Sequence, residues 1–178
     1  KFLIEIDPGV SFGTGKHETT QLCIRQLRKY LKAGDRVLDV GCGSGILSIV
    51  AMKLGASHVV GTDLDENCMT STYENMEVNH LPKEMGEFYV GNLIDDVALQ
   101  EKVGTETYDI VVANILADVI IPMAPVIPAR LKKGGVFITS GIIDFKENEV
   151  KEAIEKAGLT VLEINHQGEW VNITAQKN

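Results

Sequence analysis

The chain has 178 residues, 44% hydrophobic and 24% charged, which fits one globular domain with a single core. Its 17 Lys and Arg against 25 Asp and Glu give a net charge of −8. These charges are scattered along the sequence, which argues against a continuous basic surface for nucleic acid. The sequence shows no bilayer-spanning apolar run and no signal peptide, and its three cysteines fit neither a disulfide framework nor a metal site. We therefore expect a cytoplasmic protein that binds neither membrane, nucleic acid nor metal.

Short β-rich runs alternate with helical patterns from residue 35 onward. The predicted strands are 36–40, 58–63, 87–91, 108–114, 136–140, 159–165 and 169–175. The predicted helices are 46–54, 65–79, 117–131 and 146–157. Pro122, Pro125 and Pro128 must kink or divide the third helix, and Lys132-Lys133-Gly134-Gly135 is expected to supply its basic last turn and its stop.

This alternation predicts an α/β fold with a doubly wound, mainly parallel sheet of seven strands and helices on both faces, as in Rossmann-like proteins. The last two strands, joined by the tight His166-Gln167-Gly168, form a hairpin and therefore place one strand antiparallel in the sheet. We expect residues 1–178 to form one domain. A leading segment and helix occupy 1–34, and the core occupies 35–178.

A glycine-rich turn, Asp39-Val40-Gly41-Cys42-Gly43-Ser44-Gly45, follows the first core strand. Glycines there let backbone N–H groups approach a ligand closely, and Asp39 is expected to support the turn by accepting such groups. Asp63 ends the second strand, about 20 residues after Gly41, where an acid binds the ribose hydroxyls of an adenosine. A dinucleotide site would need glycine at position 46, which is Ile46, so the spacing favours S-adenosyl-L-methionine over NAD.

Together with these motifs, the sequence resembles the bacterial family of methyltransferases that modify the eleventh protein of the large ribosomal subunit. The resemblance covers nearly the whole chain and is carried by the segments 7–20 (DPGVSFGTGKHETT), 39–45, 112–117 (VANILA), 140–142 and 169–170. It implies methyl transfer from S-adenosyl-L-methionine to amino nitrogens, of lysine side chains or an N-terminus, on a large-subunit ribosomal protein. Family members also have an N-terminal domain that captures this protein. Nothing here corresponds to it, so we expect the catalytic domain alone.

The resemblance implies that Thr20, Gly41, Asp63 and Asn114 contact the cofactor, and we expect Gly43 and Gly45 of the same turn to do so as well. From the sequence alone, Thr20 could instead only initiate its helix.

Three further side chains are candidates for the site. Asn114 ends the fourth strand, where its carbonyl could position the substrate amine, or it could only cap the next turn. Asn92 follows the third strand, where such folds hold the adenine, and a turn role is an equal alternative. Phe12 lies in a segment that we interpret as a lid over the methyl donor.

Other functions remain open at this point. An NAD-dependent oxidoreductase is disfavoured by Ile46, and a non-catalytic nucleotide-binding module by the lid segment and Asn114. A methyltransferase for another protein or a small-molecule amine also fits. An enzyme that methylates bases would be expected to show Pro-Pro and an aromatic residue after Asn114, where this chain has Ile-Leu-Ala.

Overall fold

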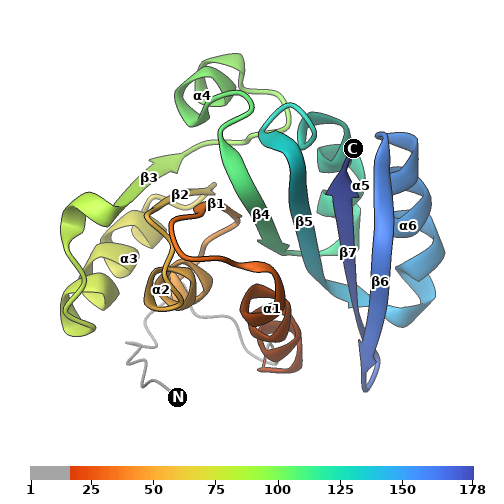
Figure 1. Ribbon diagram of the computed structural model, residues 1–178, viewed down its shortest axis with the longest axis horizontal. Helices are drawn as coiled ribbons and strands as arrows, with labels where there is room; N and C mark the ends of the chain where they lie inside the picture. Colours follow the sequence, from red (N-terminus) through yellow and green to blue (C-terminus); the bar gives the residue numbers. More distant parts are fainter. Residues whose placement is uncertain (1–16) are drawn as a thin grey trace.

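Seven strands form one mixed sheet in the order β3-β2-β1-β4-β5-β7-β6 (Figure 1). The computed structural model describes residues 17–178. The strands are β1 (Arg36–Val40), β2 (His58–Asp63), β3 (Gly86–Val90), β4 (Tyr108–Asn114), β5 (Leu131–Ile143), β6 (Leu159–Gln167) and β7 (Trp170–Lys177). Strands β1 to β5 pair in parallel, whereas β7 is antiparallel to both of its neighbours. The predicted fold class is confirmed, including the single antiparallel strand.

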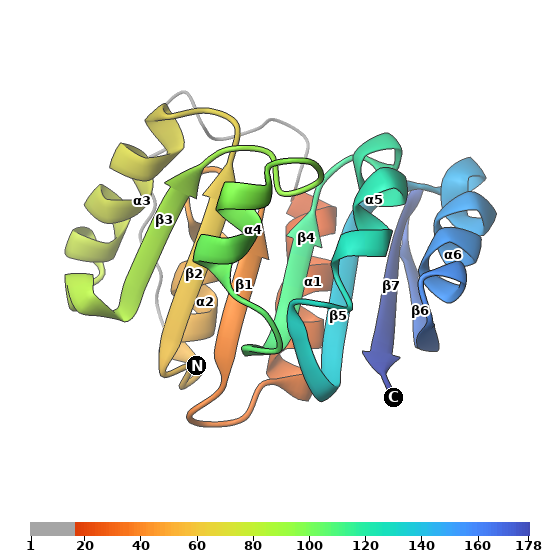
Figure 2. The same ribbon diagram turned by 90° about the horizontal axis from the view of Figure 1, so that it is seen from above.

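Helices cover both faces of this sheet (Figure 2). The α-helices are α1 (His17–Tyr30), α2 (Ile46–Lys53), α3 (Asn67–Val78), α4 (Val97–Val103), α5 (Ala117–Met123) and α6 (Glu147–Lys156). The short 3-10 helices are η1 (Lys83–Met85), η2 (Ala124–Val126) and η3 (Asp144–Lys146). Side chains of α1, α2 and α3 share one apolar core with the sheet, and those of α4, α5 and α6 share the other. None of the helices within residues 17–178 has the length and apolar character to cross a bilayer.

Strand β4 shows why the central strands are apolar on both sides. Ile110 and Val112 pack into the core under α1, α2 and α3, whereas Val111 and Ala113 pack into the core under α4, α5 and α6. Successive side chains of a strand point to opposite faces, so a strand covered on both faces must be apolar at nearly every position. The apolar run 110–113 ends at Asn114, which therefore marks the point where β4 leaves the cores.

The structure corrects the predicted helix 117–131. Helix α5 ends at Met123, η2 follows, and β5 already begins at Leu131, so Lys132 and Lys133 lie in a strand and do not form a basic last helical turn. Prolines at 122, 125 and 128 each remove a backbone donor, which explains the early end of the helix.

Several smaller boundaries also differ from the prediction. Strand β5 extends from 131 to 143 beyond the predicted 136–140, and α4 was not predicted at all. Helix α4 has seven residues and is capped by Asp96, whose carboxylate accepts from Leu99 N at 3.1 Å. In the hairpin, Gln167 pairs with Trp170, so the turn residues are Gly168 and Glu169.

Candidate functional site

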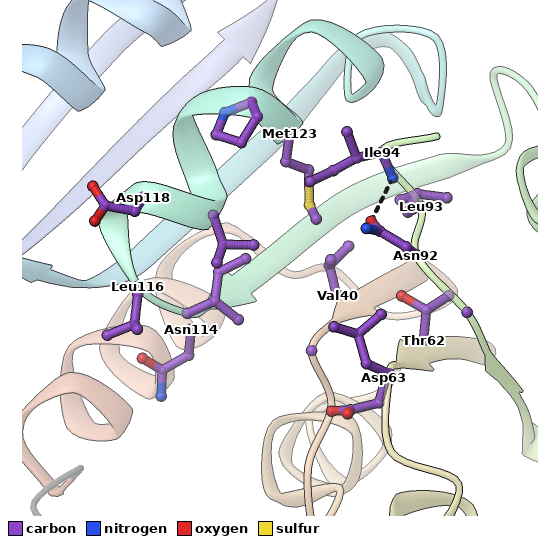
Figure 3. Close-up of a pocket in the computed structure, with 16 residues that line it drawn as sticks. Val40, Thr62, Asp63, Asn92, Leu93, Ile94, Asn114, Leu116, Asp118 and Met123 are labelled. Atoms are coloured by element: carbon purple, nitrogen blue, oxygen red, sulfur yellow. Dashed lines mark hydrogen bonds between the residues drawn. The ribbon is translucent and has the colours of Figure 1, made fainter. Parts of the chain in front are cut away.

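A pocket of about 450 Å³ opens at the carboxyl ends of β1, β2 and β4 (Figure 3). Asp63 of β2 and Asn114 of β4 line it on either side of Val40 of β1, and Asn92 lines it from the connection after β3. Met123 of α5 adds an apolar wall. In open α/β sheets this edge is where ligands bind, because the helices and loops diverge from it.

Two glycines of the turn after β1, Gly41 and Gly45, leave no space for a side chain. Gly41 has φ +73°, and a Cβ atom there would lie 2.5 Å from Ile115 Cγ2. Gly45 has φ +86°, and its Cβ would lie 2.6 Å from Thr72 Cγ2. Glycine accepts these left-handed angles without steric cost. The turn therefore places backbone at the pocket that a side chain would otherwise fill.

The carboxylate of Asp63 holds this turn against the end of β2. Its Oδ2 accepts a hydrogen bond from Gly43 N at 3.0 Å, and its Oδ1 accepts one from Asp65 N at 3.0 Å. Each carboxylate oxygen has a further lone pair. Asp63 can therefore fix the turn and still accept two hydroxyl hydrogens from a ligand.

Asp39 contacts a different group from the one we expected. Its carboxylate is buried and accepts a hydrogen bond at 2.7 Å from Ser48 Oγ in α2, rather than N–H groups of the glycine turn. Burial raises the pKa of Asp39 to about 7, against the lowering effect of Ser48 and with a further rise from the charge of Asp63. Asp39 thus ties β1 to the start of α2 beneath the turn.

Thr20 and Asn114 meet although they are far apart in the sequence. Asn114 Nδ2 donates to Thr20 Oγ1 at 3.4 Å, which joins the first turn of α1 to the end of β4. The other amide atom, Asn114 Oδ1, is buried and has no hydrogen-bond partner among residues 17–178. A buried carbonyl without a donor costs free energy, so this oxygen is available to a ligand N–H or O–H.

A bulge in β5, at Ser140 and Gly141, positions these groups. The pairing of β5 with β7 shifts register between Thr139 and Ile142, and Gly141 has φ +85°. A Cβ atom at Gly141 would lie 2.7 Å from Ile115 O and 3.1 Å from Asn114 Oδ1. The buried hydroxyl of Ser140 donates to the carbonyl oxygen of Thr19 at 2.9 Å.

The resemblance rested partly on this segment, but sequence reasoning assigned no role to Ser140 or Gly141. A glycine directly after a predicted apolar strand was the signal that could have indicated a bulge.

Asn92 has a turn role in this structure. Its Oδ1 accepts from Ile94 N at 3.0 Å, as the dashed line in Figure 3 shows. Since the same side chain lines the pocket, a contact with adenine stays a prediction.

The fold brings most of the predicted site residues to one edge. Gly41, Asp63, Asn92 and Asn114 line the pocket, and Thr20 is bonded to Asn114. Gly43 and Gly45 belong to the turn without lining the pocket. Phe12 and the predicted lid lie outside the described residues. Within residues 17–178, no group of three or more His, Cys, Asp or Glu side chains is arranged to hold a metal ion.

Comparison with known proteins decides the family. The family model described as ribosomal protein L11 methyltransferase (PrmA) matches residues 1–178. The chain belongs to this family. A ribosomal protein L11 methyltransferase of Agathobacter rectalis is 80% identical over 180 residues, and one of Lachnospira eligens is 58% identical over 176. These alignments cover 99% and 98% of this chain but 56% and 55% of the relatives, so the chain spans little more than half of their length.

Solved structures agree with this assignment. The ribosomal protein L11 methylase of Lactobacillus delbrueckii subsp. bulgaricus matches with a TM-score of 0.87 and 31% identity, over 99% of this chain and 86% of that chain. A geranyl diphosphate C-methyltransferase of Streptomyces coelicolor, solved with S-adenosyl-L-homocysteine, has a TM-score of 0.73 at 15% identity, over 91% of this chain and 80% of that chain. The second likeness shows the fold alone.

Proposed function

We propose that this chain is the catalytic domain of an enzyme that transfers methyl groups from S-adenosyl-L-methionine to amino nitrogens of ribosomal protein L11, in the cytoplasm. The nitrogens are those of lysine side chains, of the N-terminus, or of both. The observation that carries the proposal is the arrangement of the glycine turn, Asp63 and Asn114 around one pocket in a member of this family.

The residues present fit the cofactor. S-adenosyl-L-methionine supplies a methyl group that its sulfonium makes electrophilic. Gly41 lines the pocket without a side chain, so a ligand can approach the backbone there closely. Asp63 retains lone pairs for the two ribose hydroxyls, and Asn92 lies where it can contact the base. No residue is required to activate the methyl group, so the protein chiefly binds, orients and excludes water.

The substrate amine must be neutral before it can attack. Removing the proton from an ordinary lysine costs roughly 4–5 kcal/mol at pH 7, against about 1 for an α-amino group. The apolar wall that Ile115 and Met123 contribute to the pocket disfavours the charged amine, against the opposite effect of the carboxylates of Asp63 and Asp118, which also line it. Asn114 Oδ1 is a buried acceptor without a partner and can hold one amine hydrogen, which orients the nitrogen lone pair. Asn114 thus positions the amine and does not act as a base.

Thermal stabilisation tests the cofactor assignment. Excess S-adenosyl-L-homocysteine is expected to raise the Tm, since a ligand that binds only the folded state at about 100 times its Kd adds about 2.7 kcal/mol of stability. Asp63→Ala is expected to lose most of this increase. Asp95→Ala, an exposed carboxylate on the same edge, is the matched control and is expected to keep it. No increase in Tm with this ligand, or an increase with NAD instead, contradicts the proposal.

Methyl transfer tests the substrate. The protein is incubated with radiolabelled cofactor and with ribosomal protein L11, a mixture of other ribosomal proteins, ribosomal RNA or small primary amines in separate reactions. Label is expected in the first of these and on nitrogen. Label only in another protein, in RNA or in a small amine refutes the substrate assignment while keeping the activity.

A further inference from the structure

The edge of the sheet that holds the pocket carries charge of one sign. We call the combined surface of the segments that follow β2, β3, β4 and β5 there, residues 63–66, 91–96, 114–119 and 140–147, the carboxyl face. Eight of their side chains are acidic, and Lys146 is the only Lys or Arg. The charges that are scattered along the sequence are therefore concentrated in space.

The opposite edge has the reverse balance. The segments that lead into β1 to β5 there, residues 31–36, 54–58, 79–86, 104–108 and 127–135, contain six Lys or Arg and three acidic residues. An even spread of a net negative charge would not give this difference. A cation that approaches the molecule is therefore directed to the pocket side.

Six of the eight acidic groups of the carboxyl face have no ion-pair partner among residues 17–178; the exceptions are Asp118 and Glu147. Lys146 Nζ lies 3.5 Å from Asp118 Oδ1 and equally far from Glu149, so it is already shared between two carboxylates. Glu66 and Asp144 are exposed and form no ion pair with residues 17–178.

Exposed apolar side chains stand between these charges. Leu64 is 70% exposed and Leu116 58% exposed, and both line the pocket. Phe145 of η3 is 76% exposed, and the ion pair of its neighbour Lys146 with Asp118 places it beside α5. Large exposed apolar side chains around a pocket are typical of a surface that binds a partner.

Helix dipoles account for only part of this pattern. Acidic side chains stabilise the start of a helix, which explains five of the eight: Glu66, Asp96, Asp118, Asp144 and Glu147. That effect does not explain Asp95, which precedes α4 and its cap, and it does not explain exposed Leu64 and Phe145. A surface with both carboxylates and apolar groups complements lysine, whose methylene stem lies on apolar surface while its ammonium group pairs with carboxylates.

We propose that the carboxyl face is a docking surface for a lysine-rich segment of the protein substrate, so that this chain itself holds the substrate around the methylated amine. The proposal rests on the proposed function, because the pocket is taken as the site of transfer. The occupant is a segment in which lysines alternate with apolar residues. One amine enters the pocket while its neighbours lie on Leu64, Leu116 and Phe145 and pair with the surrounding carboxylates.

Binding of a fluorescent peptide of alternating Lys and Leu tests the charge. Anisotropy is measured with the protein loaded with S-adenosyl-L-homocysteine. The double variant Glu66→Lys with Asp144→Lys is expected to bind about tenfold more weakly at low ionic strength, with the difference shrinking in salt. Glu84→Lys with Glu155→Lys changes the net charge equally at the opposite edge and is expected to stay within about twofold of the unmodified protein. Equal losses in the two double variants, or equal binding of a Glu-Leu peptide, would overturn the proposal.

A second pair of variants tests the apolar groups. Phe145→Ser with Leu64→Ser is expected to weaken binding of the same peptide severalfold. Leu162→Ser, at a 41% exposed position in β6 away from the carboxyl face, is expected to leave it unchanged. Unchanged binding in the first of these contradicts the docking surface.

The peptide assay also separates this proposal from the proposed function, because binding does not require transfer. If the carboxyl-face variants bind the peptide more weakly but the unmodified protein methylates no amine, only the proposed function is refuted. If the two charge-reversal double variants methylate ribosomal protein L11 with equal KM values, only the docking surface is refuted.

Discussion

Replacing Gly141 with alanine tests whether the β5 bulge is packed against the site as tightly as the structure indicates. Gly141 has φ +85°, and an added Cβ would lie 2.7 Å from the carbonyl oxygen of Ile115. That oxygen belongs to the backbone directly after β4, where Ile115 N donates to Ser140 O at 3.2 Å, so it cannot rotate away as a side chain would. Gly134 provides a matched control in the same strand, because it has φ +83° and no atom within 4 Å of its added Cβ.

The expected loss of stability follows from these two geometries. The left-handed conformation costs alanine roughly 1–2 kcal/mol at either position, partly offset by about 0.4–1 kcal/mol from the stiffer unfolded chain. Gly134→Ala should therefore lose about 1 kcal/mol. Gly141→Ala adds overpacking of about 1–3 kcal/mol, for a total of about 3. In a chain of this size these losses correspond to Tm decreases of roughly 2–4 °C and 6–12 °C.

Thermal unfolding followed by circular dichroism measures both variants. Gly141→Ala should also lose more of the Tm increase that S-adenosyl-L-homocysteine gives, since its Cβ displaces Ile115 and crowds Asn114 Oδ1. Equal Tm values for the two alanine variants would show that the bulge has space for a Cβ atom at Gly141. That result would contradict the inference that the bulge positions Asn114.

Three other substitutions give distinct expectations. Ser140→Ala removes a buried hydrogen bond to Thr19 and should cost about 1 kcal/mol in denaturant unfolding, with faster amide exchange in the first turn of α1. Because the pKa of Asp39 is raised in the folded state, this carboxyl ionises first in the unfolded state, and the free energy of unfolding falls as pH rises from about 4 to about 7. Asp39→Asn does not ionise, so it should gain stability relative to the unmodified protein over that range. Hydrogen bonds from neighbouring side chains, that of Lys29 the strongest, outweigh the effect of burial and lower the pKa of Glu163 to about 2. Any stability advantage of the unmodified protein over Glu163→Gln should therefore disappear as pH falls from about 4.5 to about 2.

Most of the fold could be predicted because each central strand is a short, largely apolar run that ends at polar or glycine residues. Strands 36–40, 58–63 and 108–114 have the predicted bounds. The failures lie where local pattern and tertiary context disagree. The segment 117–131 is apolar enough for a helix, but its prolines end the helix early, and Leu131 pairs with Tyr108 of β4 at the start of β5.

The candidate site was predictable where the sequence places residues in one motif, as in the glycine turn. It was less predictable where residues meet only in the fold. The contact of Thr20 with Asn114 and the bond of Ser140 to Thr19 join α1 to β4 and β5, and no local spacing indicates them. Asp39 resembled a turn acceptor by position, but α2 folds back over it and supplies Ser48 instead.

The position of β7 imposes an order on assembly. Strand β6 is earlier in the chain, yet β7 lies between it and β5, so β6 has no partner in the sheet until β7 is in place. The β6–β7 hairpin is local in sequence and can form quickly, whereas its docking onto β5 closes a longer loop. Until that docking, β5 presents an unpaired edge over residues 136–143 in an otherwise formed sheet. Such an edge is where another chain can add a strand, so substitutions that slow the closing of the hairpin should promote aggregation before they lower equilibrium stability.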